Sequence, residues 1–164
     1  MKRMICAVLL AAASVPAAAM AQDDTAPDAA AVDAATEEAP IVIEARTFMA
    51  GYAEDLLAGD IVAIANRYDR SGAWRMGEGE KAFDTWDGIR RIYAEEWQKP
   101  ATFAWRDLSY EPVGPDAIMV LGLFDWGFDD GGPAITVSYT ALMVRQEGEL
   151  RIRLEDESAA PEKP

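Results

Sequence analysis

The sequence predicts an α+β domain in which three N-terminal helices pack inside a strongly curved antiparallel sheet, giving a cone. Apolar residues recur mostly at helical spacing up to Pro100, whereas apolar and polar residues alternate after it. Short connections between the alternating segments predict an antiparallel meander with the helices on one face. Gly122 and Gly127 interrupt the second strand of this meander and indicate bulges or bends that would curve the sheet.

The first predicted helix spans residues 43–58 and presents one apolar face. The residues of this face recur at i, i+3, i+4, i+7 and i+11: Ala45, Phe48, Met49, Tyr52 and Leu56. Gly59 suits the left-handed position just beyond a helix, and Asp60 suits the N-cap of the next helix. Tyr52 therefore lies on the inner face, where it either fills the core or points its hydroxyl into a pocket.

Two further helices are predicted before the strands. The second follows Asp60 and carries these residues on one side: Ile61, Ile64, Ala65 and Tyr68. The Gly-rich segment that follows predicts an edge strand around Trp74 and a loop. Asp84 or Thr85 caps the third helix, and Pro100 ends it. Its apolar stripe consists of Ile89, Ile92, Tyr93 and Trp97.

Four strands follow, at residues 102–114, 116–128, 133–146 and 149–158. Each alternates apolar and polar residues, and the segments between them carry the Gly, Pro and Asp residues of tight turns. The segment FDDGGP lacks the series of oxygen ligands that a calcium loop needs, so a hairpin turn is predicted there.

The two ends of the chain have a different composition from the domain at residues 41–158. Residues 1–21 begin with basic residues, continue as a short apolar run and end in Ala-Met-Ala, which predicts a secretory signal peptide; a retained membrane anchor is the alternative. Residues 22–40 are rich in Ala, Pro and acidic residues and predict a disordered linker, and residues 159–164 predict a disordered tail. The protein is therefore expected to be periplasmic or secreted.

Charge and residue usage exclude several classes of partner. The formal net charge is −14, so neither nucleic acid nor an anionic membrane is expected as a partner after signal cleavage. The single cysteine lies in the predicted signal peptide, so the mature chain forms no disulfide. The chain has no histidine, which removes the commonest metal ligand and the usual neutral-pH base. No metal and no cofactor are predicted.

Four segments, YAEDLLAGDIVAIANRYD, GIRRIYAEEW, GPDAIMVLG and VRQEGELRIRLEDES, follow one another in this order. Their order and spacing resemble the nuclear transport factor 2-like superfamily, in its SnoaL-like and ketosteroid-isomerase-like branch. The resemblance covers nearly all of residues 43–158. It implies a cone-shaped pocket and a homodimer.

The resemblance also implies a role for Tyr52. In ketosteroid isomerases, a tyrosine at this place on the first helix donates a hydrogen bond to the developing enolate oxygen. The position of the base falls near Met76 and that of the second donor near Thr140, and neither residue type supplies the same chemistry. Steroid isomerisation by this mechanism is therefore not expected.

Two carboxylates are candidate catalytic groups beside Tyr52. Asp156 stands where many relatives have a histidine and shares a strand face with Leu154, so it is predicted at the inward end of the last strand; an exposed strand end within EDES is the alternative. Asp125 faces inward if Leu123 does, with Trp126 outward, unless a bulge reverses the alternation. A carboxylate in an apolar site has a raised pKa and can act as acid or base.

The predicted function is the binding of a small, largely apolar molecule in the central pocket. The residues expected to bind it are Tyr52, Tyr68, Trp74, Trp97, Tyr139 and Leu154. One alternative is a cofactor-free isomerase, cyclase or hydratase that uses Tyr52 with Asp125 or Asp156. The other is a non-enzymatic dimerisation module whose cavity is filled by side chains.

Overall fold

A computed structural model describes residues 38–77, 79–129 and 131–159. The predicted signal peptide at residues 1–21 and most of the predicted linker and tail lie outside these residues. Within them, no helix has the length and apolar character needed to cross a membrane. The elements are α1 Pro40–Ala58, α2 Ile61–Asn66, β1 Ala73–Gly77, β2 Glu80–Asp84, α3 Trp86–Glu95, β3 Thr102–Gly114, β4 Ala117–Gly127, β5 Ile135–Gln146 and β6 Glu149–Ala159.

The helices begin and end close to the predicted positions. Helix α1 begins earlier, at Pro40, because proline is well tolerated in the first turn, where its missing N–H has no intrahelical partner. Gly59 ends α1 with φ +71°, and the Asp60 side chain accepts a hydrogen bond from the Ala63 N–H at 2.9 Å. Thr85 caps α3. Helix α2 ends at Asn66, and Tyr68 pairs with β6 in an isolated bridge instead of continuing the helix.

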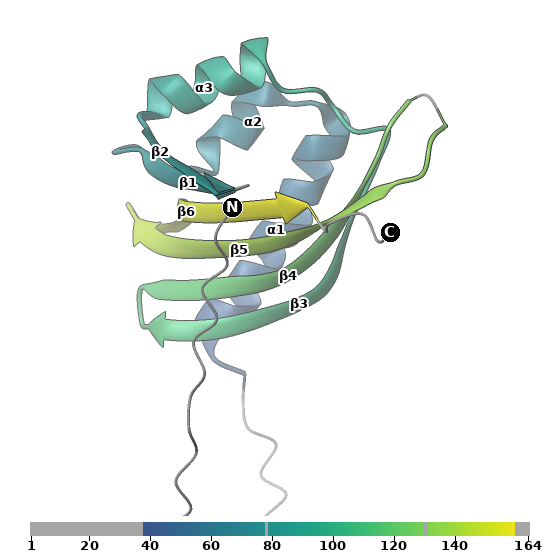
Figure 1. Ribbon diagram of the computed structural model, residues 1–164. Coiled ribbons are helices and arrows are strands. Elements are labelled where there is room, and N and C mark those ends of the chain that lie inside the picture. The colour runs from purple at the N-terminus through teal and green to yellow at the C-terminus, as the bar shows by residue number, and fades with distance from the viewer. Residues whose placement is uncertain (1–37, 78, 130, 160–164) are drawn as a thin grey trace, which may run out of the picture. The chain divides into compact units, whose positions relative to one another are not determined.

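The sheet has six strands in the order β2-β1-β6-β5-β4-β3 (Figure 1). Strands β3 to β6 form the predicted antiparallel meander. The sheet is mixed rather than purely antiparallel, since β1 runs parallel to β6. The segment expected to hold one edge strand and a loop forms a hairpin of β1 and β2, which extends the sheet beyond β6.

A bulge opposite Gly122 helps to curve the sheet. Asp107 and Leu108 of β3 lie between the pairs that flank Gly122 of β4, and Asp107 has φ +51°. A Cβ at Gly122 would come within 2.6 Å of Leu108 and 2.9 Å of the Arg106 carbonyl oxygen. Glycine therefore permits the close approach of the two strands, and the expected bulge lies on the strand that faces it.

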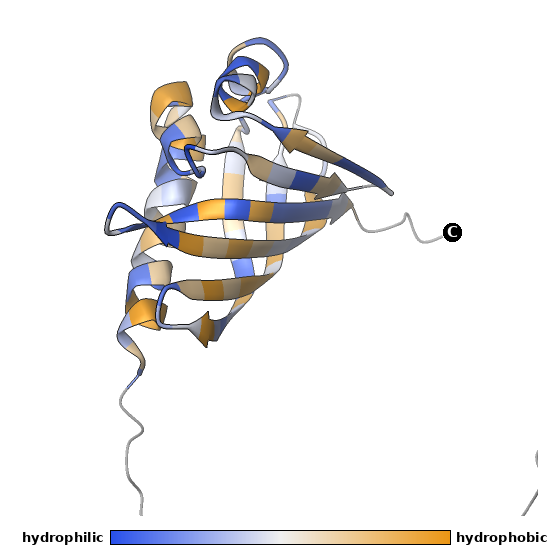
Figure 2. Ribbon diagram, turned by 90° about the vertical axis from the view of Figure 1, so that its left-hand side faces the viewer, coloured by the Kyte–Doolittle hydropathy of each residue, from blue (hydrophilic) through white to orange (hydrophobic). Residues whose placement is uncertain are grey.

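The concave face of the sheet and helix α1 form the core. Figure 2 shows apolar and polar residues alternating along the strands. The inward residues of β4 and β5 include Ile118, Val120, Ala141 and Met143, all fully buried. They pack with Ala45 and Met49 of α1 in one hydrophobic cluster. This packing fills one end of the concavity and leaves the other end available for a cavity.

Candidate functional site

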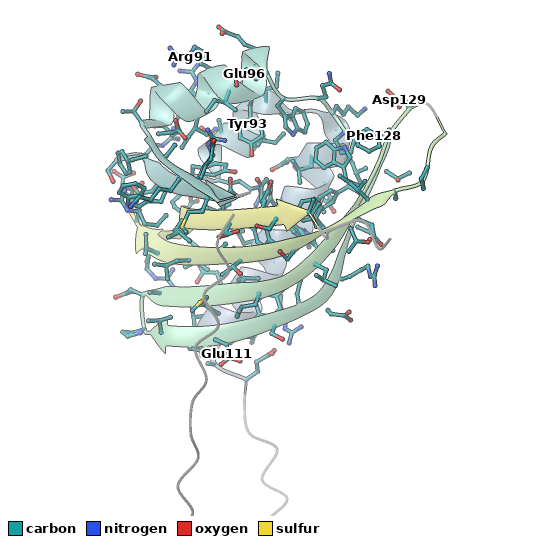
Figure 3. The ribbon with its side chains drawn as sticks, in the orientation of Figure 1. Arg91, Tyr93, Glu96, Glu111, Phe128 and Asp129 are labelled. Atoms are coloured by element: carbon teal, nitrogen blue, oxygen red, sulfur yellow. The ribbon has the colours of Figure 1, made fainter. Side chains whose placement is uncertain are left out.

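A cavity of about 460 Å³ lies between α1, α3 and one end of the curved sheet. Its walls include Tyr52 from α1, Tyr93 from α3, and Trp97, the second residue after α3. The ends of β3 and β4 contribute Phe103, Trp105, Phe124, Trp126 and Phe128. Figure 3 shows Tyr93 between α3 and the sheet, and Phe128 at the end of β4.

The aromatic walls follow from the pairing of β3 with β4. Phe103 pairs with Trp126 and Trp105 pairs with Phe124, so the alternation of each strand directs all four rings to the concave face. The Trp105 indole N–H donates to the Met49 carbonyl oxygen at 2.9 Å, which fixes the ring against α1. Rings packed in this way give the cavity rigid apolar walls.

Three tyrosine hydroxyls meet at the inner wall of the cavity. The Tyr52 oxygen lies 2.9 Å from that of Tyr68 and 3.1 Å from that of Tyr93, and Tyr68 lies 2.7 Å from Tyr93. Burial raises the pKa of each of these phenols, so all three stay protonated at neutral pH. We call these three residues the tyrosine cluster. Tyr52 and Tyr93 line the cavity, and Tyr68 lies behind them.

Glu155 of β6 lies behind the tyrosine cluster. The Tyr68 hydroxyl donates to Glu155 Oε1 at 2.7 Å, whereas the buried Oε2 has no hydrogen-bond partner among the described residues. Burial raises the pKa of Glu155 to about 8, and the charge of Glu157 adds to this effect. Glu155 can therefore hold a proton at neutral pH, when an exposed glutamate would have lost it.

Glu157 brings a second carboxylate to the same face, at the wall of the cavity itself. The residue is exposed to solvent at the cavity rim, but the surrounding protein limits hydration of its carboxylate and raises its pKa. The positive charge of Arg75 opposes this rise. The negative charge of Glu157 in turn raises the pKa of Glu155. The two carboxylates therefore titrate as a pair.

Solved structures resemble this chain in fold. One is a nuclear transport factor 2-like protein of unknown function from Shewanella oneidensis MR-1, with a TM-score of 0.64, 17% identity, and coverage of 72% of this chain and 98% of that one. A ketosteroid isomerase-like protein from Erwinia carotovora atroseptica SCRI1043 gives a TM-score of 0.58 and 16% identity, covering 79% of this chain and 99% of that one. The chain has the nuclear transport factor 2-like fold. This fold confirms the resemblance read from the sequence.

Another similar structure is a protein of unknown function with a cystatin-like fold from Nostoc punctiforme PCC 73102, with a TM-score of 0.62 and 10% identity, covering 75% of this chain and 93% of that one. No family model matches the sequence, and no curated protein matches it. The likeness therefore rests on the nuclear transport factor 2-like fold, and the chemistry has to be argued from the side chains of this chain.

The prediction that Leu154 and Asp156 face inward is wrong. Leu142 pairs with Leu154 while Met143 pairs with Ile152, so Arg153 is an extra residue at a bulge in β6. Because one extra residue reverses the alternation, Glu155 and Glu157 take the inward positions and Leu154 and Asp156 face outward. The acidic run EDES therefore does contribute to the site, but with Glu155 and Glu157 in place of Asp156.

The inward position predicted for Asp125 is also wrong. The even-numbered residues of β4 face the core, so Trp126 faces the cavity and Asp125 the outer surface. Its carboxylate accepts hydrogen bonds from Arg106 Nη1 at 3.0 Å and from Thr136 Oγ1 at 2.6 Å. These hydrogen bonds hold the pKa of Asp125 below its usual value. Asp125 is therefore an ionised surface residue away from the cavity.

The nuclear transport factor 2-like fold brings together some of the predicted ligand-binding residues and separates others. Tyr52 and Trp97 line the cavity. Tyr68 and Tyr139 are buried beside it, and the Tyr139 hydroxyl has no hydrogen-bond partner among the described residues. Trp74 does not belong to the cavity: it pairs with the outward Leu154 and packs edge-on against Phe83 on the outer side of the sheet.

Tyr93, Glu155 and Glu157 belong to the site but are not among the site residues predicted from the sequence. Tyr93 lies on the predicted apolar stripe of the third helix, and its hydroxyl reaches the tyrosine cluster. Glu155 and Glu157 are two residues apart in EDES, so they share one face of the strand. A bulge before them in the strand turns that face inward. Within the described residues, no group of three or more Asp or Glu side chains is placed to hold a metal ion.

Proposed function

We propose that the exported chain binds a small, largely apolar molecule in the aromatic cavity and anchors its polar group on Tyr52 and Tyr93. The observation that carries this proposal is the 460 Å³ cavity, whose aromatic walls enclose one cluster of hydroxyls. Ligand sites in proteins are typically concave, mostly apolar and supplied with a few convergent polar groups. A cavity of this size has room for a molecule of one or two rings.

Each part of the cavity has a distinct task in this proposal. The rings of Trp97, Trp105 and Trp126 remove the apolar body of the ligand from water, which contributes roughly 25 cal/mol for each Å² buried. The hydroxyls of Tyr52 and Tyr93 orient the polar end. Because Tyr68 and Glu155 hold these hydroxyls from behind, the anchor is formed before the ligand arrives.

Calorimetric titration with 2-naphthol, a small aromatic molecule with a single hydroxyl, tests this proposal. We expect saturable binding that weakens about fivefold to tenfold in Tyr52→Phe, because the variant keeps the ring and loses the hydrogen bond. Tyr110→Phe is the matched control, since Tyr110 does not line the cavity. Absence of saturable binding, or equal losses in both variants, would contradict the proposal.

A second candidate function is acid–base catalysis, favoured by Glu157 at the cavity wall. Its pKa is raised to about 7, so that both protonation states exist near neutral pH. Glu157 is placed to take a proton from a carbon atom beside a carbonyl group. Tyr52 or Tyr93 would donate a hydrogen bond to the carbonyl oxygen by turning its proton from the tyrosine cluster to the cavity. In this candidate Glu157 replaces the aspartates Asp125 and Asp156, both of which face away from the cavity.

Deuterium exchange into 2-tetralone, followed by NMR, tests the catalytic candidate. The C1 protons of this small aromatic ketone lie beside its carbonyl group. We expect the protein to accelerate exchange and Glu157→Gln to lose about 10²-fold or more of that acceleration. Equal exchange with and without protein, or full activity in the variant, would exclude Glu157 as a base for this class of ketone.

A further inference from the structure

The charged residues at the aromatic cavity are all acidic. Glu96, at the C-terminal end of α3, and Glu157 of β6 line it together with the aromatic rings. Among the described residues that line the cavity, none is Lys or Arg. An anionic ligand would therefore meet two carboxylates without a compensating positive charge, whereas a cation would be attracted.

We propose that the ligand of this cavity is a small organic cation, an amine or quaternary ammonium group carried on an apolar body. The inference rests on the proposed binding function and specifies the chemistry of the molecule bound there. Three observations carry it: the orientation of the aromatic rings, the absence of an ion-pair partner for Glu157 among the described residues, and the arrangement of protons in the tyrosine cluster.

The aromatic rings form walls that meet nearly at right angles. Trp97 and Trp126 lie 6.1 Å apart with an interplanar angle of 89°, and Phe103 meets Trp126 at 86°. Trp97 also meets Tyr93 edge-on, at 5.6 Å. The faces of aromatic rings carry negative electrostatic potential, and cages of such rings bind ammonium groups. Several rings at right angles can surround a cationic group from more than one side.

The side chain of Glu157 makes no hydrogen bond and no ion pair with any residue that the structure describes. The nearby Arg75 acts on its charge and lines a second depression together with Glu157. The Arg75 guanidinium, however, donates to Asp84 Oδ2 at 2.7 Å and makes no hydrogen bond or ion pair with Glu157 among the described residues. The carboxylate of Glu157 is thus open to a cation that enters the aromatic cavity. The net charge of −14 would add a long-range attraction for such a ligand.

The tyrosine cluster presents acceptors to the cavity. Its three hydroxyls have three protons, while four close oxygen–oxygen contacts link them with one another and with Glu155. Once Tyr68 donates to Glu155, the protons of Tyr52 and Tyr93 are used within the cluster. The lone pairs left on Tyr52 and Tyr93 accept hydrogen bonds from the N–H groups of a protonated amine. A quaternary ammonium group has no N–H, and the same lone pairs attract it by charge alone.

The test compares two probes of the same shape by calorimetric titration of the wild-type protein: phenyltrimethylammonium and tert-butylbenzene, in which carbon replaces the charged nitrogen. We expect the cation to bind about tenfold more tightly at the same ionic strength. Equal or tighter binding of tert-butylbenzene would overturn the inference and leave the proposed binding function standing. Absence of binding by both probes would overturn both.

Substitution of Glu157 separates the local charge from the net charge of the protein. Glu157→Gln should lower the affinity for phenyltrimethylammonium about threefold to tenfold and leave tert-butylbenzene binding unchanged. Glu111→Gln is the matched control, since it removes the same charge at a distance from the cavity, as Figure 3 shows. Equal losses in the two variants would overturn the assignment of Glu157 to cation recognition. Circular dichroism of both variants verifies that they fold.

Discussion

At the scale of single residues, Glu155 is the least ordinary side chain of the core. Its carboxyl group is buried, and one of its oxygens accepts a hydrogen bond from the Tyr68 hydroxyl. The other oxygen has no hydrogen-bond partner among the described residues. Burial of an ionised carboxylate with one partner is unfavourable, so the group keeps its proton to higher pH in the folded protein than in the unfolded chain. The stability of the domain must therefore depend on pH where Glu155 titrates.

Glu155→Gln should flatten this pH dependence. The pKa is raised from about 4.5 in the unfolded chain to about 8, so its stabilising contribution is complete below about pH 4.5 and is lost as the pH rises towards 8. Glutamine keeps the acceptor for Tyr68 and does not titrate. Between about pH 5 and about pH 8, we therefore expect the free energy of unfolding of the variant to rise relative to that of the wild type. The expected rise is on the order of 1–3 kcal/mol, measured by urea unfolding.

The effect of Glu155 on the pH dependence of stability can be separated from that of the other titrating groups. Glu44 and Asp69 have lowered pKa values, so their contributions change with pH below the window in question. Glu157 titrates within the window and should leave a smaller residual slope in the variant. The exposed Glu111, exchanged for Gln, serves as the comparison. Parallel stability curves for Glu155→Gln and wild type would contradict the prediction, because they would show that Glu155 has the same pKa in the folded and the unfolded protein.

At the scale of elements, the site depends on the register of two strands. Strand positions 102–114 and 149–158 were predicted from alternation and turn residues, and the structure has strands there. Alternation alone does not determine which face is inward when apolar residues occupy both faces, as they do in β4. A one-residue bulge at Arg153 leaves no marker in the sequence, yet it decides that Glu157 rather than Asp156 reaches the cavity.

The helices were easier to predict because their signals are local. Gly59 and Asp60 end one helix and begin the next through their own backbone and side-chain preferences. Tyr52 was placed correctly on the inner face of α1 for the same reason. Its partners Tyr68 and Tyr93 lie 16 and 41 positions further along the chain. Only the assembled domain brings the three hydroxyls together.

At the scale of the whole molecule, the outer face of the sheet carries apolar side chains that no described helix covers. Met119, Leu142 and Leu154 pair with one another across β4, β5 and β6, and Leu154 pairs with Trp74 of β1. These side chains are partly exposed, and 39% of Trp74 is exposed. We call this row of four residues the outer apolar row.

The outer apolar row is where the predicted homodimer should form. An exposed apolar row across four strands is typical of a surface that another protein covers, and a second copy of this chain offers the same row in a symmetric contact. We therefore expect a dimer in light scattering at about 50 µM. Leu142→Glu should give a monomer, because a dimer would bury two new like charges in an apolar contact.

Ser138→Glu provides the control for this experiment, since it adds the same charge at an exposed position on the outer face of β5, away from the row. It should leave the dimer intact. The cavity lies on the opposite face of the sheet, so the monomeric Leu142→Glu variant should still bind 2-naphthol. A wild-type monomer at this concentration would exclude the outer apolar row as a self-association surface. Loss of 2-naphthol binding along with the dimer would instead mean that the cavity needs the partner subunit to hold its shape.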